Sequence, residues 1–275
     1  MIHFWKMNGA GNDFVVIDNR ALKLQLSREQ IAALCHRQFG IGADGLLAVE
    51  PAQNGADFRM RYYNADGGEA EMCGNGARCF ARFVNHLSNH SLEQVSFETM
   101  AGTIQADFVE DYNVRVTLSE PFDLSFNESL DAAGQSFEIH SVNTGVPHAV
   151  VIVDDLESVE INKLGAAIRN HDRFAPEGTN VNFVQVVGPE EIAVRTYERG
   201  VEGETLACGT GMVACAIIHE ELTENPPPIT LRVHSGDRLQ VNFEHPSDLS
   251  YHNVTLTGPA EFVFEGDIDE STLAP

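Results

Sequence analysis

The sequence predicts an α+β fold of two pseudo-symmetric domains that arose by internal duplication, each a curved, mainly antiparallel sheet or barrel around a central helix. Two observations carry this prediction. Each half of the chain places a Gly-rich cysteine turn directly before a helical pattern, and four segments of the first half recur in order in the second. These segments are NDFVVIDN (12–19) with PHAVVIVDD (147–155), HRQFGIGADGLL (36–47) with HDRFAPEGTNVNF (171–183), RYYNADGGEAEMCGNGAR (61–78) with RTYERGVEGETLACGTGM (195–212), and MAGTIQADF (100–108) with HSGDRLQVNF (234–243).

The spacing between the two copies is nearly constant. Matching residues lie 135, 135 and 134 positions apart: Phe39 and Phe174, Cys73 and Cys208, and Gly102 and Gly236. Each single match is weak, but four matches in one order at one offset are hard to explain except as two copies of one fold.

Each copy reads in order as strand, helix, strand, cysteine turn, helix and several strands. In the first copy, residues 13–19 form an alternating pattern with turn residues on both sides, which predicts a strand. Ser27 with Gln30 forms a capping box for a helix that we expect to run to about Phe39. Residues 58–64 predict the next strand. After Cys73, a helix follows from apolar residues at i, i+3, i+4 and i+7 spacing, which are Phe80, Phe83, Val84 and Leu87.

In the second copy, GMVACAII at 211–218 is apolar on all sides and predicts a buried helix. Alternating segments predict strands at 95–100, 103–109, 113–118, 229–235, 238–243 and 253–258. The tail EFVFEGDI at 261–268 could return to the first domain. We therefore expect one domain at 1–118 plus 264–275 and the other at 119–263.

Composition narrows the classes of protein. The chain has 275 residues, is 43% hydrophobic and carries a formal charge of −24. Such a polyanion repels nucleic acid and anionic membranes, so neither is expected as a partner. The sequence shows no membrane-length apolar run and no secretion signal pattern, so a cytoplasmic location is expected. The acidic excess fits an ordinary acidic protein and a salt-rich cytoplasm about equally well.

The five cysteines do not suggest a disulfide framework. Their number is odd and no C-x-x-C occurs, which argues against paired bridges, zinc ribbons and thioredoxin-like redox pairs, and no metal is expected. Cys35, Cys79 and Cys215 fall within helical patterns, where a buried structural cysteine is the ordinary interpretation.

Cys73 and Cys208 stand instead at predicted helix N-termini. Backbone N–H groups and the helix dipole favour a thiolate there and lower the thiol pKa. The accompanying glycines at 74, 76, 209 and 211 let an anion approach the backbone. For one such turn, a buried cysteine at a helix start remains the better interpretation. Two turns at matched positions of a duplicated fold favour a function.

Two thiols on opposite sides of one carbon could invert a stereocentre, since one removes a proton and the other delivers one. Two opposed helix N-termini could stabilise the carboxylate of an amino acid during this step. Pyridoxal phosphate would be the usual alternative, but the chain has three lysines and none lies beside a phosphate-cradling motif. No cofactor is therefore expected.

Four motifs resemble the signatures of diaminopimelate epimerase: KMNGAGNDF, YNADGGEAEMCGNGARC, GTNVNF and YERGVEGETLACGTG. The resemblance runs from about Met7 to the final strands. It implies a cofactor-independent enzyme of lysine biosynthesis that interconverts LL- and meso-diaminopimelate, its small-molecule partner. Proline racemases and phenazine-type isomerases share the fold, but the former carry a His-containing first cysteine turn and the latter lack the cysteine pair.

The resemblance also implies roles for single residues. Cys73 and Cys208 would be the acid/base pair, and His148 would support proton balance near the thiols. Backbone N–H groups would hold the reacting carboxylate at Gly74, Asn75, Gly209 and Thr210. The pocket and the far end of the substrate would involve Asn12, Asn64, Asn180, Glu198 and Arg199. A homodimer is left open.

Two positions depart from many family members. Gly45 stands where a Gln is often found, and Val146 where an Asn often precedes Pro-His. Two alternatives therefore stay open at this point. One is a racemase of another amino acid, such as glutamate or hydroxyproline, on the same fold. The other is a non-catalytic, redox-sensing binding protein that uses the cysteine pair.

Overall fold

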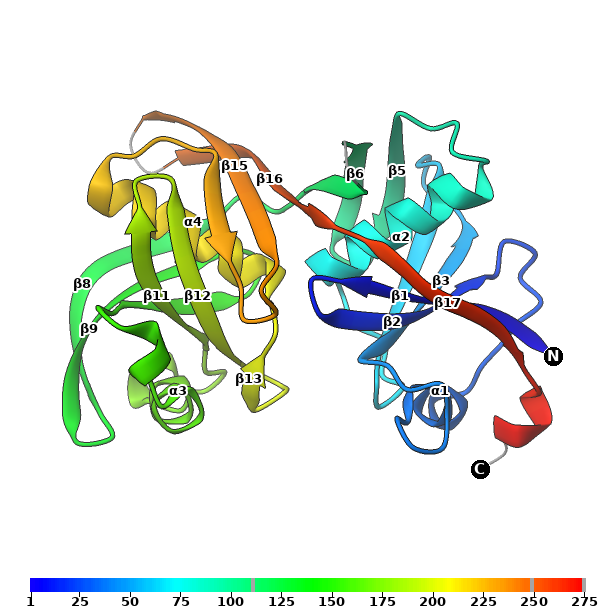
Figure 1. The fold of residues 1–275 in the computed structure, drawn as a ribbon, viewed down its shortest axis with the longest axis horizontal. Helices are drawn as coiled ribbons and strands as arrows, with labels where there is room; N and C mark the ends of the chain where they lie inside the picture. The colour runs from blue at the N-terminus through cyan, green and yellow to red at the C-terminus, as the bar shows by residue number, and fades with distance from the viewer. Residues whose placement is uncertain (110–111, 248–249, 274–275) are drawn as a thin grey trace. The chain divides into compact units, whose positions relative to one another are not determined.

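A computed structural model describes residues 1–109, 112–247 and 250–273, and the chain divides into two compact units (Figure 1). Unit 1 comprises Met1–Val116 with Gly258–Pro275, and unit 2 comprises Thr117–Thr257. The return to unit 1 comes earlier than residue 264, because the whole of β17 (Glu261–Ile268) pairs antiparallel with β1 (Ile2–Gly9). The tail at 261–268 therefore does return to the N-terminal unit.

The sheet of unit 1 has the strand order β17-β1-β2-β3-β4-β5-β6-β7. Its pairs are antiparallel except for β2 with β3 and β4 with β5, which are parallel. The remaining strands are β2 (Asn12–Asp18), β3 (Gly45–Pro51), β4 (Phe58–Asn64), β5 (Gln94–Thr99), β6 (Gly102–Phe108) and β7 (Asn113–Thr117).

Unit 2 repeats this pattern in the order β8-β9-β10-β11-β12-β14-β15-β16, again with its third and fourth and its fifth and sixth strands parallel. The strands are β8 (Phe122–Ala132), β9 (Gln135–Asn143), β10 (Pro147–Ile152), β11 (Asn180–Gly188), β12 (Glu191–Glu198), β13 (Gly203–Thr205), β14 (Ile229–Arg232), β15 (Arg238–Ser247) and β16 (Ser250–Pro259). Short β13 pairs with β12. The matching strand orders confirm the predicted duplication and α+β fold.

Each sheet packs a buried helix on one face and a second helix on the other. The buried helices are α2 (Gly74–Leu87) and α4 (Gly209–Thr223), and the second helices are α1 (Arg28–Cys35) and α3 (Ile161–Arg169). The described part of the chain also contains short 3-10 turns, which are η1 (Leu156–Ser158), η2 (Asp172–Phe174) and η3 (Glu270–Leu273).

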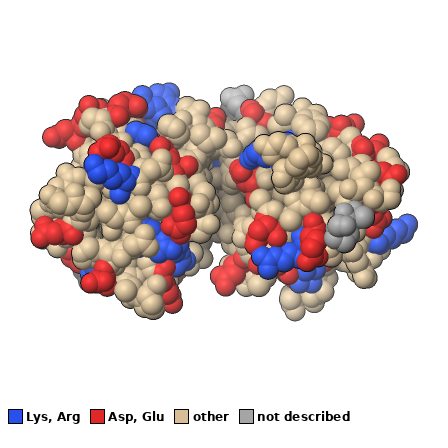
Figure 2. Space-filling view, turned by 90° about the horizontal axis from the view of Figure 1, so that it is seen from below, with Lys and Arg blue, Asp and Glu red and all other residues tan. Residues whose placement is uncertain are grey.

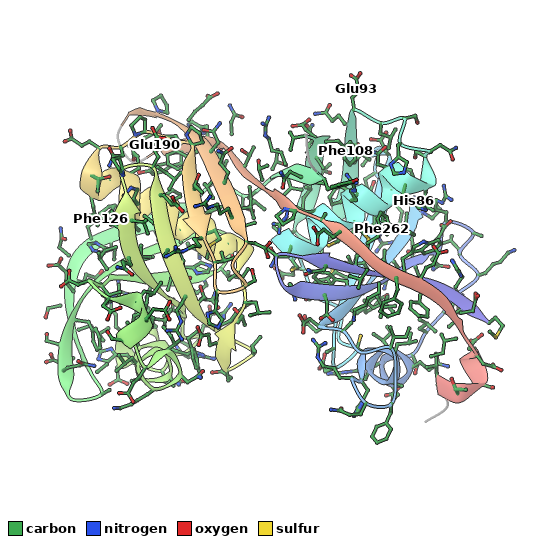
Figure 3. The ribbon with its side chains drawn as sticks, viewed as in Figure 1. His86, Glu93, Phe108, Phe126, Glu190 and Phe262 are labelled. Atoms are coloured by element: carbon green, nitrogen blue, oxygen red, sulfur yellow. The ribbon has the colours of Figure 1, made fainter. Side chains whose placement is uncertain are left out.

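The two faces of β2 show how the layers form. Phe14 approaches Gly76 of α2, whereas Val15 packs with Ile31 and Leu34 of α1. Successive strand residues point to opposite faces, so one run of apolar residues supports both helices. Figure 3 labels a further contact of this unit, between His86 on α2 and Phe262 on β17, whose ring centroids lie 5.1 Å apart.

The predicted capping box is present, since the Ser27 side chain accepts from the Gln30 backbone N–H and the Gln30 side chain accepts from the Ser27 backbone N–H. The expected end of this helix at Phe39 is wrong, because α1 ends at Cys35. The chain then folds back, and the amides of Ile41 and Gly42 bond to the Leu34 carbonyl. The reversal brings Gly40 so close to α1 that a side chain there would collide with its backbone.

Acidic side chains are spread over both units on the face shown in Figure 2, with basic side chains among them. Within the described part of the chain, no helix has both the length and the apolar character needed to cross a membrane.

Candidate active site

Cys73 is the N-cap of α2. Its backbone is extended, and its sulfur accepts the Gly76 N–H at 3.4 Å. The side chain is half-buried, and Sγ lies 3.5 Å from the Asn12 side-chain oxygen. The predicted helix start is therefore confirmed, and it presents the sulfur where helix N–H groups favour a thiolate.

Asn12 is held in place by its neighbours. Its Nδ2 donates to the Asp44 carboxylate at 2.6 Å, and this carboxylate also accepts from the Asp13 backbone and from Arg37. Burial opposes ionisation of Asp13, yet hydrogen bonds from Arg37 and Lys6 lower its pKa to about 2. This charged network fixes the start of β2, where Asn12 contacts Cys73.

The buried guanidinium of Arg78 holds the start of α2 in place by hydrogen bonds. Arg78 is fully buried, donates to the Asn75 side-chain oxygen at 3.0 Å, and donates to the Pro259 carbonyl at 3.2 Å. Asn75 is itself 1% exposed. Arg78 therefore ties the cysteine turn to the returning chain.

Asn64 lies exposed at the end of β4, opposite Gly45 in the sheet. Its Oδ1 accepts from the Tyr62 hydroxyl at 2.8 Å. A Cβ on Gly45 would lie 2.5 Å from the Tyr63 carbonyl oxygen and 2.9 Å from the Tyr62 ring. The Tyr62 ring thus occupies the space beside Gly45, so a longer side chain there would need the strand to shift.

Cys208 is the N-cap of α4 and the counterpart of Cys73 in unit 2. It is 7% exposed and therefore more enclosed. Its sulfur lies 3.6 Å from the Thr210 hydroxyl. A Cβ on Gly211 would lie 2.5 Å from the Asn182 side-chain oxygen, so only glycine lets this helix start approach the strands so closely.

Beneath this turn, His148 lies fully buried on β10. Its Nε2 is 3.0 Å from the Thr210 hydroxyl, and its Nδ1 is 3.1 Å from the Asn182 amide nitrogen. Burial, reinforced by the positive charge of Arg199, lowers the pKa of His148 to about 3. The imidazole is therefore neutral near pH 7. Thr196 bonds to the Asn182 side-chain oxygen at 2.9 Å.

Asn180, Glu198 and Arg199 cluster at the adjoining strand ends of unit 2. The Asn180 side chain accepts from the Arg199 backbone N–H at 2.8 Å and donates to the Pro147 carbonyl at 3.2 Å. It therefore positions the Arg199 turn. Glu198 and Arg199 are half-buried, as is Val146 in the turn before β10.

The remaining cysteines are buried and free, as predicted. Burial raises the pKa of the Cys35 and Cys79 thiols to about 12 and that of Cys215 well above its ordinary value. These three thiols are therefore protonated near neutral pH.

The structure thus groups the predicted residues within each unit. Cys73, Gly74, Asn75, Asn12 and Asn64 belong to unit 1. Unit 2 holds the rest, which are Cys208, Gly209, Thr210, His148, Asn180, Glu198 and Arg199. Sequence reasoning missed the polar side chains that support them: Asp44, Tyr62, Arg78, Asn182 and Thr196. Asn182 and Arg78 had a signal, since they lie inside the GTNVNF and YNADGGEAEMCGNGARC motifs.

A second polar cluster lies at the other end of α4. Glu220, Glu221 and His245 place side-chain atoms within 4.8 Å of one another, a grouping that could hold a metal ion. The two His245 ring nitrogens, however, face different carboxylates, at 3.2 Å from Glu220 and 3.6 Å from Glu221. Both ring nitrogens are thus paired with side chains of α4.

Comparison with known proteins gives one consistent result. Residues 4–121 and 140–263 match the family model described as diaminopimelate epimerase. The diaminopimelate epimerase of Aquifex aeolicus strain VF5 is 44% identical over 283 residues, covering 99% of each chain. That of Chlorobaculum tepidum is 41% identical over 264 residues, covering 95% of this chain and 99% of the relative.

Among solved structures, a hydroxyproline epimerase from Agrobacterium vitis with bound trans-4-hydroxy-L-proline superposes with a TM-score of 0.72. The alignment covers 96% of this chain and 91% of the other at 15% identity. This similarity confirms the fold alone.

Proposed function

Because the chain belongs to the diaminopimelate epimerase family, we propose that Cys73 and Cys208 are the two thiols with which it moves the α-proton of its substrate. The enzyme is an epimerase of lysine biosynthesis that interconverts LL- and meso-diaminopimelate. The alternatives, a racemase of glutamate or hydroxyproline and a non-catalytic redox sensor, are not favoured by these relatives.

The proposed reaction is a two-base proton transfer. One sulfur, as thiolate, removes the α-proton from one face of the carbon, and the other, as thiol, delivers a proton to the opposite face. Each step moves one proton, so the two sulfurs exchange protonation states in every turnover. The observation that carries this proposal is that Cys73 and Cys208 cap equivalent helices of the two copies.

Helix N-termini also supply the electrostatics. Backbone N–H groups of Gly74, Asn75, Gly209 and Thr210 would hold the reacting carboxylate and stabilise the carbanion. The Cys73 thiol donates to the Asn12 side-chain oxygen at 3.5 Å, a contact that would orient the sulfur.

The far end of the substrate carries a carboxylate and an ammonium group. Arg199, Glu198 and the amides of Asn64 and Asn180 offer the matching charges and hydrogen bonds. His148 would act as a neutral support beside Cys208. The proposed mechanism assigns no step to a cofactor or a metal.

A mechanism with two free thiols requires a reducing compartment, which supports the proposal of a cytoplasmic enzyme. Sedimentation at several protein concentrations distinguishes a monomeric enzyme from a homodimer.

The test follows the α-proton of LL-diaminopimelate in deuterated water. We expect wild type to incorporate deuterium while forming the meso isomer, and Cys73→Ala and Cys208→Ala each to abolish epimerisation. Cys79→Ala is the matched control, since this thiol is buried in α2 and should leave turnover largely intact. Substantial epimerisation by either active-site variant would refute the two-thiol assignment.

A further inference from the structure

The hydroxyl of Thr210 lies between two groups that compete for its proton. Its oxygen is 3.0 Å from His148 Nε2 and 3.6 Å from Cys208 Sγ. A threonine hydroxyl has one proton to donate and can also accept. Whether that proton points at the ring or at the sulfur depends on the tautomer of His148.

Asn182 fixes this tautomer. Its Nδ2 donates to the Ala149 carbonyl at 3.1 Å, and its Oδ1 accepts from the Thr196 hydroxyl at 2.9 Å, so the amide has one orientation. The same Nδ2 lies 3.1 Å from His148 Nδ1. An amide NH₂ group donates only, so Nδ1 accepts and the ring proton resides on Nε2.

The proton on Nε2 then determines the direction of the hydroxyl. Nε2–H donates to the Thr210 oxygen, which leaves the hydroxyl proton free to point at the Cys208 sulfur. Burial lowers the pKa of His148 to about 3, so this neutral form persists throughout the neutral pH range. Two other groups act on this network electrostatically: the charge of Arg199 helps to lower the pKa of His148, and Cys208 helps to raise that of Cys215.

We propose that the Thr210 hydroxyl donates to the Cys208 sulfur, and that Asn182 holds it in that direction through His148. This inference rests on the proposed role of Cys208 in proton transfer. Thr210 touches the reacting sulfur, whereas Asn182 and His148 are positioning residues. A hydrogen-bond donor stabilises a thiolate more than a thiol, so the network favours Cys208 as the base.

The other copy of the fold differs at this point. The residue that matches Thr210 is Asn75, and its side-chain oxygen accepts from Arg78. The Cys73 sulfur accepts a backbone N–H of its own helix and lies beside the Asn12 amide. Two equivalent helix starts therefore surround their sulfurs with different polar groups, since the Asn12 atom that faces Cys73 is an oxygen, which accepts.

The test measures the ionisation of Cys208 by ultraviolet thiolate absorbance in Cys73→Ala protein. Burial keeps Cys35, Cys79 and Cys215 protonated near neutral pH, so in this variant the titration follows the ionisation of Cys208. We expect Thr210→Val to raise the midpoint by about one pH unit, a tenfold weaker acid, because a hydrogen bond to a charged group is lost. Thr210→Ser keeps a hydroxyl and should recover most of the wild-type midpoint.

Thr223→Val is the matched control, because this hydroxyl donates to the His219 carbonyl at the far end of the same helix. It should leave both the midpoint and turnover unchanged. A midpoint that Thr210→Val does not move would overturn the proposal.

Asn182→Asp tests the positioning role. A carboxylate beside Nδ1 draws the ring proton there, Nε2 becomes an acceptor, and the Thr210 hydroxyl turns toward the ring. We expect the midpoint to rise as in Thr210→Val although Thr210 is present. An unchanged midpoint in the folded variant would refute the role of Asn182; if the variant does not fold, the Thr210 pair decides the proposal.

These outcomes separate the inference from the function. A wild-type protein that exchanges no α-proton of diaminopimelate refutes the proposed function, even if its titration depends on Thr210. An active enzyme whose thiol titration is independent of Thr210 refutes only the network.

Discussion

Tyr62 lies beside Gly45, the position at which many family members carry a Gln. Its ring fills the space beside Gly45, and its hydroxyl donates a hydrogen bond to Oδ1 of Asn64. This bond orients the amide, and in the role proposed for Asn64 its Nδ2 donors would face the substrate carboxylate. We expect Tyr62→Phe to raise KM for diaminopimelate about three- to tenfold with little change in kcat, because one hydrogen bond that orients a binding amide is lost.

Tyr63→Phe is the control for steady-state kinetics, since it removes a hydroxyl from the opposite face of the same strand, where Tyr63 packs against the α1 core. Equal effects of the two variants, or a Tyr62→Phe effect confined to kcat, would show that Tyr62 does not orient Asn64.

His148 gives a pH prediction for stability. Burial lowers its pKa in the folded state to about 3, whereas the unfolded chain titrates near 6.5. The unfolded state therefore binds the extra proton first, and stability that is complete above pH 6.5 is lost as pH falls toward 3. The expected loss is about 1 kcal/mol per pH unit below about 6.

The measurement is the free energy of unfolding by urea between about pH 7 and pH 5, above the range in which Asp13 and Glu128 protonate. His148→Gln should flatten the slope, whatever it does to stability at pH 7. His140, whose pKa burial also lowers, should leave a smaller slope of the same sign. A His148→Gln slope equal to wild type would contradict the prediction.

At the scale of elements, α2 and α4 offer a matched comparison of glycines at the same helical position. A methyl group on Gly76 would make ordinary contacts of 3.4 Å with Leu47 and Phe14, whereas one on Gly211 would lie 2.5 Å from the Asn182 side-chain oxygen. We expect Gly211→Ala to cost about 1–3 kcal/mol of stability and much of the activity, because it displaces the network under Cys208. Gly76→Ala should change stability by less than about 1 kcal/mol, since alanine also favours the helix.

Thermal unfolding and kcat/KM of the two variants check this asymmetry. If Gly76→Ala proved as damaging as Gly211→Ala, the close approach of α4 to Asn182 would not explain the glycine.

Local patterns predicted some elements well and others poorly. The apolar run at 211–218 predicted α4, which is buried along most of its length, and the capping box placed the start of α1. The end of α1 was missed because it depends on a fold-back onto Leu34, which is a tertiary contact. Strands β8 and β9 went unrecognised because many of their residues are exposed and their pairing shifts register.

The candidate site shows the same limit. The glycine turns predicted Cys73 and Cys208, because a helix start is encoded by neighbouring residues. Tyr62 and Arg78 could not be found this way, since Tyr62 packs beside Gly45 of the neighbouring strand and Arg78 bonds to the Pro259 carbonyl, which is far away in the sequence. Their roles depend on side-chain geometry that one sequence does not encode locally.

At the scale of the whole molecule, duplication explains why one chain carries two cysteine turns. Eight described strands in each unit follow the same order. The cysteine comes after the fifth of them in both units, with the short β13 standing between in unit 2. One ancestral helix start thus supplied two sulfurs, and later substitutions gave them different neighbours. The duplication thus supplies the two cysteines that the proposed two-thiol mechanism requires.

The net charge of −24 sets a last prediction for the whole molecule. With 41 acidic and 17 basic residues, the folded chain repels itself, and salt weakens that repulsion as the Debye length falls from about 10 Å at 0.1 M to about 3 Å at 1 M. We expect potassium chloride to raise the melting temperature at neutral pH by roughly 4–8 °C over this range, equivalent to about 2 kcal/mol.

Repeating the melts near pH 5 isolates the cause, because the chain approaches its isoelectric point of about 4.6 and carries little net charge there. If screening is responsible, the stabilisation by salt should largely vanish at the lower pH. A salt effect of equal size at both pH values would show that chloride acts through apolar burial, as salting-out does, and that the acidic excess gives this enzyme no dependence on a salt-rich environment.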